Sequence, residues 1–242
     1  MSRSFPWTYN EAEINAVTDY QSQEEAARYD ARMRTVRDVD GENAVLVQRM
    51  DSLLSGGLKN AEILEIGTGT GAFARFAAAR CSHVTALDVS APMLAFARQK
   101  AQEAGISNVE FRPYGFLSFD YPPARYDVVF SSLALHHLND VWKAEAVKKI
   151  FDSLKPGGVF VLMDVIFDCE GGELDEYLTR TIDPNMNESM KIALYGHIRL
   201  EDSTFRWIME EIAARAGFEL LSFEKFGVMG HLLCARKPAS DV

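Results

Sequence analysis

The feature that most constrains the fold is a short segment, residues 63–72, with the sequence ILEIGTGTGA. An apolar run is followed by three alternating glycines and then by helix-forming residues, which is typical of a strand, a tight turn and the start of a helix. Glycine suits such a turn because it tolerates positive φ and, lacking a Cβ, lets the backbone approach a ligand closely. A second apolar run ends at Asp88, about 20 residues further on, where a carboxylate can accept hydrogen bonds from a ribose. The pattern therefore predicts half of a nucleotide pocket.

The spacing of the glycine turn does not identify the nucleotide. Gly67, Gly69 and Ala72 also fit the dinucleotide-binding spacing G-x-G-x-x-G/A, which leaves an NAD(P)-dependent oxidoreductase open. Two later motifs fall outside that pattern: Ser131–Leu138, with the sequence SSLALHHL, and Leu154–Gly158, with the sequence LKPGG. An oxidoreductase would leave both of them unexplained.

With these motifs in this order, and with Glu65 two residues before Gly67, the chain resembles the class I S-adenosylmethionine-dependent methyltransferases. The resemblance covers roughly residues 43–165 and, in outline, the C-terminal third. Gly115–Phe119 and the paired histidines are similar to those of a group of small bacterial methyltransferases without an assigned function. The resemblance implies S-adenosylmethionine as cofactor, S-adenosylhomocysteine as product and a small-molecule acceptor.

After residue 55, short β-branched runs alternate with helical stretches, the pattern of a parallel sheet with crossover helices. We expect an α/β fold with a doubly wound, mostly parallel seven-stranded sheet and an antiparallel C-terminal hairpin, the Rossmann-like fold that the resemblance implies. A length of 242 residues suits one domain over residues 1–242, with a helical N-terminal cap (1–55) and a covering insertion (167–200). The expected strands are 61–66, 82–88, 108–113, 125–131, 158–166, 218–226 and 228–236, and the expected helices are 11–17, 24–36, 42–54, 70–79, 92–104, 141–154 and 202–216.

Composition and charge narrow the range of partners. The 25 basic and 35 acidic residues give a net charge of −10, which repels phosphate backbones, so we expect no nucleic-acid partner. The three cysteines are scattered and form no C-x-x-C, so neither a disulfide framework nor a zinc cluster is indicated. The N-terminus lacks the apolar core of a signal peptide, and the most apolar run, Val159–Phe167, contains Asp164 and is too short to span a bilayer. We therefore expect a cytoplasmic protein that binds no membrane, and the apolar C-terminal hairpin favours a possible homodimer.

The resemblance also implies the residues that bind the cofactor. Gly67 and Gly69 would pass their backbone against its amino-carboxypropyl part, Asp88 would hold the ribose hydroxyls, and Val89 and Met93 would line the adenine. The full predicted cofactor-binding set is Tyr29, Glu65, Gly67, Thr68, Gly69, Asp88, Val89, Met93, Gly115, Phe116 and Ser132.

Two members of this set need separate comment. Tyr29 and Asp30 look like the A-x-x-Y-D element with which many small-molecule methyltransferases fold an N-terminal helix over the cofactor. Gly115 departs from the pattern, because related sequences commonly carry there an acidic residue that accepts a hydrogen bond from the adenine amino group. Losing such a bond costs about 1.5–3 kcal/mol. The departure leaves open a non-catalytic protein that binds S-adenosylmethionine and accepts no substrate.

The paired histidines follow the fourth expected strand. A neutral imidazole can take a proton from a hydroxyl, thiol or amine, because its pKa lies near the operating pH. We therefore predict His136 as the catalytic residue and His137 as a second candidate, with shaping of the pocket wall as the alternative role for both. Ubiquinone-pathway O-methyltransferases carry two glutamates before a histidine as metal ligands, where this chain has Leu133 and His136 before His137. We therefore expect no metal site.

Overall fold

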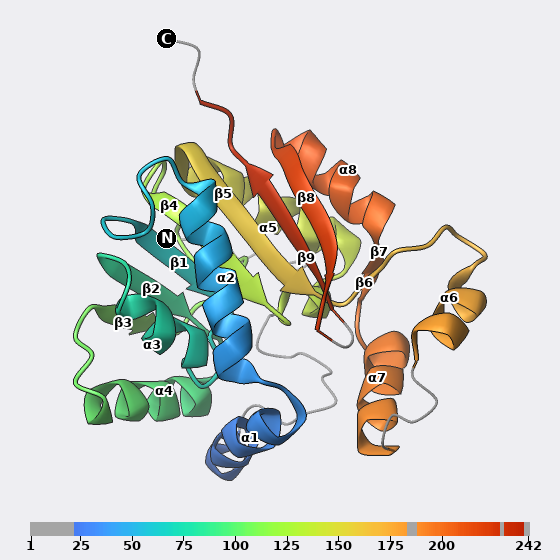
Figure 1. Cartoon of the computed structure of the whole chain (residues 1–242), viewed down its shortest axis with the longest axis horizontal. Helices are drawn as coiled ribbons and strands as arrows, with labels where there is room; N and C mark the ends of the chain where they lie inside the picture. The colour runs from blue at the N-terminus through green and yellow to red at the C-terminus, as the bar shows by residue number, and fades with distance from the viewer. Residues whose placement is uncertain (1–21, 183–187, 228–229, 240–242) are drawn as a thin grey trace.

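The structure, a computed structural model, describes residues 22–182, 188–227 and 230–239. Its centre is a seven-stranded sheet in the order β3-β2-β1-β4-β5-β9-β8 (Figure 1). Neighbouring strands from β3 to β5 run parallel, and β9 pairs antiparallel with β5 and β8. The expected fold class is therefore confirmed. The strands are β1 (Glu62–Ile66), β2 (His83–Leu87), β3 (Val109–Arg112), β4 (Tyr126–Ser132), β5 (Leu154–Asp164), β8 (Glu219–Phe226) and β9 (Gly230–Arg236), and a small separate sheet pairs β6 (Ile166–Phe167) with β7 (Thr204–Phe205).

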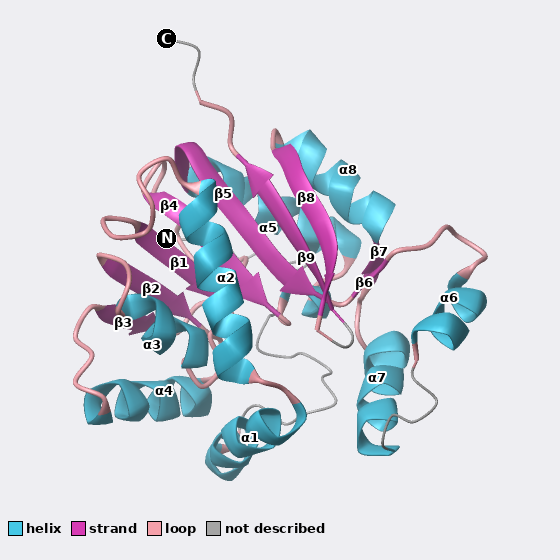
Figure 2. Ribbon diagram, viewed as in Figure 1, coloured by secondary structure: helices cyan, strands magenta, loops and turns pink. Residues whose placement is uncertain are grey.

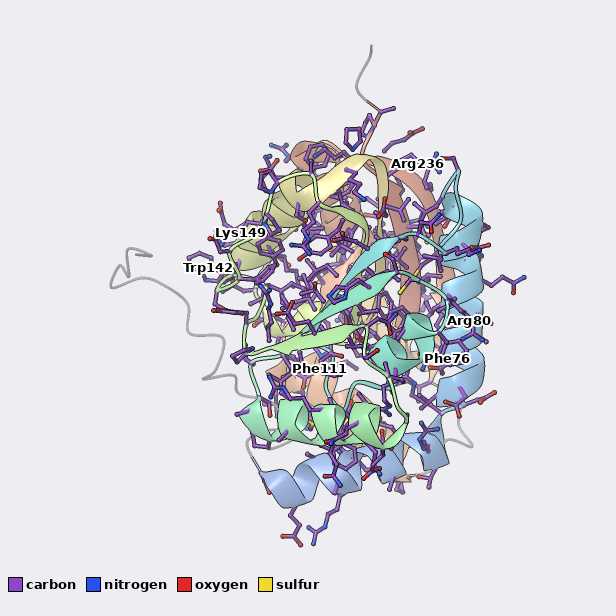
Figure 3. The ribbon with its side chains drawn as sticks, turned by 90° about the vertical axis from the view of Figure 1, so that its left-hand side faces the viewer. Phe76, Arg80, Phe111, Trp142, Lys149 and Arg236 are labelled. Atoms are coloured by element: carbon purple, nitrogen blue, oxygen red, sulfur yellow. The ribbon has the colours of Figure 1, made fainter. Side chains whose placement is uncertain are left out.

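Helices cover both faces of the sheet (Figure 2). They are α1 (Gln23–Val36), α2 (Val39–Leu53), α3 (Ala72–Ala78), α4 (Ala91–Glu103), α5 (Asp140–Ser153), α6 (Leu174–Thr181), α7 (Glu188–Leu200) and α8 (Arg206–Ala216), with a short 3₁₀ helix η1 (Leu135–His137). In the view turned by 90°, Phe76 of α3 and Trp142 of α5 lie on opposite sides of the sheet (Figure 3). The two faces therefore have separate apolar cores.

The side chains of each parallel strand alternate between these cores, as the pleat requires. In β1, Leu64 and Ile66 pack with α5 and α8, whereas Ile63 packs with α2 and α3. In β4, Val129 and Phe130 divide in the same way. Because both faces of the sheet are buried, the sequences of such strands are continuous apolar runs. This is why the strands could be predicted from the sequence.

The strand order reverses between β1 and β4, since β2 and β3 continue to one side of β1 while β4 and β5 continue to the other. In open α/β sheets, ligands bind beyond the carboxyl ends of the strands at such a reversal. Figure 1 shows α1 and α7 on the side of the sheet toward which the arrows of β1 and β4 point. The fold therefore brings both covering segments to the edge where a ligand is expected.

The structure corrects several expected boundaries. The expected strand 158–166 is β5 (Leu154–Asp164), which begins four residues earlier because Leu154 pairs with Tyr126 of β4. The expected helix 202–216 begins at Arg206, since residues 204–205 form β7. Neither α6 nor α7 was expected from the sequence. The expected helix 11–17 lies outside the described residues, as does the start of the expected strand 228–236.

Within the described residues, no helix combines the length and the apolar character that a membrane span requires.

Candidate functional site

A cavity of about 190 Å³ lies at the carboxyl ends of β1, β2 and β4, where the strand order reverses. The structure brings all of the predicted cofactor-binding residues onto its wall: Tyr29, Glu65, Gly67, Thr68, Gly69, Asp88, Val89, Met93, Gly115, Phe116 and Ser132. These residues come from α1, α4, three strand ends and the loops that follow the strands, so their convergence is a property of the fold and not of one motif. Their role in binding the cofactor stays a prediction.

The glycine turn between β1 and α3 forms one side of the cavity. Gly67 and Gly69 have positive φ, +79° and +52° respectively, a conformation that disfavours residues with a Cβ. At Gly67 an added Cβ would stand 2.4 Å from the Cβ of Ala134, whereas at Gly69 it would meet no atom within 4 Å. The first glycine therefore allows close packing against the segment after β4, and the second leaves space beside its backbone for a ligand.

Asp88 stands directly after β2 and fixes the opposite side of the same turn. Its Oδ2 accepts a hydrogen bond from the Gly69 N–H (2.7 Å), and its Oδ1 accepts one from the Ser90 N–H (2.8 Å). Burial raises the pKa of Asp88, while these two bonds act in the opposite direction by favouring the charged form. The arrangement holds a carboxylate at the cavity wall, where a ligand with hydroxyl groups would find an acceptor.

Glu65 lies at the end of β1 with only 3 % of its surface exposed. Its Oε2 accepts a hydrogen bond from the Thr68 hydroxyl (2.7 Å). Burial raises the pKa of this carboxyl to about 7, although the Thr68 bond favours the charged form. Glu65 is therefore a second carboxyl on the cavity wall, and its charge changes near neutral pH.

Helix α1 closes the cavity on the side away from the sheet. The Thr70 hydroxyl donates to Asp30 Oδ1 (2.9 Å), which ties α1 to the glycine turn. Sequence analysis missed Met33 and Arg37, which also line the cavity. Met33 could have been found from the A-x-x-Y-D element, because it follows Tyr29 by four residues and so shares its helix face, whereas Arg37 lies just beyond the end of α1.

Gly115 and Phe116 border the cavity from the loop after β3. Gly115 is buried, and its N–H donates to the Ser118 hydroxyl (2.8 Å). Phe116 is 5 % exposed and belongs to the core on the α5 side. This loop therefore offers an apolar ring and backbone groups, with no carboxyl side chain at position 115.

His136 does not reach the cavity wall. Its Nδ1 pairs with the Asp164 carboxylate, and its Nε2 lies 3.2 Å from Oε2 of Glu201. Burial acts to lower the pKa of His136, but the two carboxylates outweigh it and raise this pKa to about 9. The ring is thus protonated at neutral pH, which does not suit a base, and proton transfer by His136 stays a prediction. The histidine that borders the cavity is His137.

Sequence analysis did not connect Asp164 and Glu201 with the paired histidines. Asp164 was visible as a lone charge in the most apolar run of the chain, and such a charge is rarely buried without a partner. Glu201 follows α7 and reaches His136 only through the tertiary fold, so no local pattern indicated it.

Comparison with known proteins agrees with this arrangement. A methyltransferase domain family matches residues 63–158. The chain is 37% identical over 105 residues to an uncharacterized methyltransferase of Geobacillus kaustophilus, covering 43% of this chain and 47% of that protein. It is 33% identical over 144 residues to one of Bacillus velezensis, covering 59% and 64%. The chain therefore contains a methyltransferase domain over residues 63–158.

The methyltransferase fold also extends beyond the matched segment. A phosphoethanolamine N-methyltransferase of Haemonchus contortus, solved in complex with S-adenosyl-L-methionine, superposes with a TM-score of 0.66 at 18% identity, covering 92% of this chain and 60% of that one. At this identity the likeness shows the fold alone. The matches to the two bacterial methyltransferases span about half to two thirds of their length.

Proposed function

We propose that this methyltransferase moves a methyl group from S-adenosylmethionine to a small-molecule acceptor by in-line displacement. The observation that carries the proposal is the cavity itself, whose wall holds the glycine turn, Asp88 and Tyr29 together. The Haemonchus contortus relative of the same fold holds S-adenosyl-L-methionine, which supports the same cofactor here.

The residues on the cavity wall fit this cofactor in their chemistry. The space beside Gly69 would admit a ligand against the backbone, and the Asp88 carboxylate would accept hydrogen bonds from the ribose hydroxyls. Val89, Met93 and Phe116 would supply the apolar surface that an adenine ring needs. S-adenosylmethionine, when bound, supplies a methyl group on a positively charged sulfur that is ready for transfer.

The contribution of the protein is chiefly to position the reactants and to exclude water. Good positioning contributes about 7–11 kcal/mol in favourable cases, whereas a general base typically gives about 10²–10⁴-fold. Two features of the chain would position the reactants: the glycine turn is fixed by Asp88, and α1 is held to that turn by the Thr70–Asp30 hydrogen bond. The proposal therefore does not depend on a base, although His137 is placed to hold or accept a proton on the wall.

Titration calorimetry tests the cofactor directly. The purified chain is titrated with S-adenosylmethionine, S-adenosylhomocysteine and NAD⁺, and the titrations are repeated on Asp88→Ala and Asp88→Asn. We expect binding of the two sulfur nucleotides only, weakened at least about 100-fold in Asp88→Ala because two bonds to a charged acceptor are lost. Asp152→Ala is the control, since Asp152 pairs with Lys148 on the solvent-exposed face of helix α5.

The alternatives predict different results. Binding of NAD⁺ alone would overturn the proposal in favour of an oxidoreductase. Binding of S-adenosylmethionine without transfer of a labelled methyl group to any member of a broad library of hydroxyl, amine and thiol compounds would favour a non-catalytic binding protein. Gly115 is the residue that motivates this second alternative, since its position offers the adenine no carboxyl acceptor.

A further inference from the structure

Beside the cavity, two histidines and a glutamate bring their ligand atoms together. The side chains of His136, His137 and Glu201 each offer one nitrogen or oxygen, and these atoms all lie within 4.8 Å of one another. We propose that these three residues bind a divalent transition-metal ion at the edge of the cavity, with zinc as the reference ion.

The distances and the ligand types suit such an ion. Ligands about 2.0–2.1 Å from zinc stand about 3.4 Å apart in a tetrahedron, and His136 Nε2 lies 3.2 Å from Glu201 Oε2. The rings of His136 and His137 are adjacent, with centroids 4.4 Å apart. Two imidazole ligands out of three favour zinc and its neighbours over the harder calcium and magnesium ions.

Asp164 gives His136 the support that a metal-binding histidine normally has. Its carboxylate pairs with Nδ1 of the ring, and its second oxygen accepts from the His136 N–H (3.0 Å). A carboxylate at one ring nitrogen fixes the tautomer and aims the other nitrogen at the metal. Here that other nitrogen is Nε2, which faces Glu201 and would release its proton to solvent when the ion binds.

Charge and position add two further arguments. The side chains of Asp164 and Glu201 are 2% and 3% exposed, so two buried carboxylates flank one imidazole, and buried carboxylates need cationic partners. Three protein ligands leave one position of a tetrahedral site open, as in catalytic zinc sites. Since His137 lines the cavity, that position lies at its edge.

The sequence expectation of no metal site rested on the absence of two glutamates before His137. Glu201 supplies a carboxylate from 64 residues further along the chain, directly after α7. The catalytic consequence rests on the proposed function: a bound dication would coordinate an acceptor oxygen and lower its pKa.

The test measures metal binding without the cofactor. The chain, prepared without a histidine tag and freed of metal with a chelator, is titrated with Zn²⁺ by calorimetry and with Co²⁺ by visible absorption. We expect one ion per chain, with affinity reduced at least about 100-fold in His137→Ala and Glu201→Gln, and about 10–100-fold in Asp164→Asn through lost positioning. His83→Ala, which removes a histidine on β2, should leave the affinity unchanged.

Two results would overturn the metal site: no stoichiometric binding, or binding that is unchanged in both His137→Ala and Glu201→Gln. Should the variants fail to fold, proton NMR of the Co²⁺-loaded wild-type chain decides, because two imidazole rings must show paramagnetically shifted resonances. Failure of the metal titration alone would leave the proposed methyl transfer standing, and failure of S-adenosylmethionine binding alone would leave the metal site standing.

Discussion

At the residue scale, the two glycines of the turn have different tasks, although the sequence presents them as equivalents. Gly67 is confined by the Cβ of Ala134, and Gly69 faces open space. The sequence could predict both glycines, because a positive φ at a strand-to-helix turn requires them locally. It could not separate their tasks, because Ala134 reaches the turn from the segment after β4.

Alanine substitutions should separate these tasks. Gly67→Ala combines a left-handed backbone cost of about 1–2 kcal/mol with overpacking of about 1–3 kcal/mol, so we expect a loss of about 2–5 kcal/mol in the free energy of unfolding. Gly69→Ala should lose only the backbone cost of about 1–2 kcal/mol. Its methyl group narrows the space beside the backbone, however, and should weaken S-adenosylmethionine binding at least about tenfold. Urea denaturation and calorimetry measure the two effects. Equal losses of stability in the two variants would contradict this division.

At the element scale, helix α1 packs against α4 and contributes to the wall of the cavity. Among the buried apolar residues of α1 is Ala26, with 1% exposure, and the Thr70–Asp30 hydrogen bond is its link to the glycine turn. An element with little buried apolar surface opens at low free-energy cost. We therefore expect the Thr70–Asp30 hydrogen bond to contribute measurably to the local stability of α1.

Removing the Thr70 hydroxyl should loosen this cover. In Thr70→Val we expect amide hydrogen exchange over residues 26–36 to accelerate at least about tenfold, since a lost bond to a carboxylate costs about 1.5–3 kcal/mol. Exchange in α5 should stay unchanged, and bound S-adenosylmethionine should slow exchange in α1. Thr35→Val is the matched control, because the Thr35 hydroxyl bonds to the Arg32 carbonyl of α1 itself. Unchanged exchange over residues 26–36 in Thr70→Val would refute the link.

The local sequence pattern of each element explains whether it could be predicted from the sequence. The five parallel strands were found within a few residues, because each is an apolar run whose pattern follows from burial on both faces. Strands β6 and β7 were not found, since two-residue strands that pair Ile166 with Thr204 have no local pattern. Helix α6 was also missed: it has only eight residues, a length at which a helical pattern is hard to recognise, and none of them is buried.

At the scale of the whole molecule, the cavity borders both apolar cores, through Phe116 and Phe73, and its polar groups have a stability cost. Glu65 belongs to a central strand whose neighbours Leu64 and Ile66 are fully buried. Its pKa is raised from 4.5 in the free side chain to about 7 by burial. A carboxyl with a raised pKa in the folded state contributes its full stability below pH 4.5 and loses it as the pH rises through about 7.

This linkage gives a pH dependence that a single variant isolates. Glu65→Gln keeps an acceptor for the Thr68 hydroxyl and has no charge to bury. Its free energy of unfolding should therefore lack the pH-dependent contribution of this carboxyl. Between pH 5 and pH 8, the free energy of unfolding of the wild type should fall by about 2–3 kcal/mol relative to the variant. The measurement is urea denaturation of both chains at several pH values in the absence of cofactor.

The control for this experiment comes from the same strand. Glu62, at the other end of β1, pairs with Arg125 at 2.8 Å, and its side chain is 36% exposed. Glu62→Gln removes one carboxyl, as Glu65→Gln does, but takes it from a site where water screens the charge. The wild type should therefore show no comparable fall relative to Glu62→Gln over this pH range. If Glu65→Gln and Glu62→Gln gave parallel pH profiles, the charge of Glu65 would have to be accommodated in the fold, and the polar end of the cavity would be better hydrated than its burial indicates.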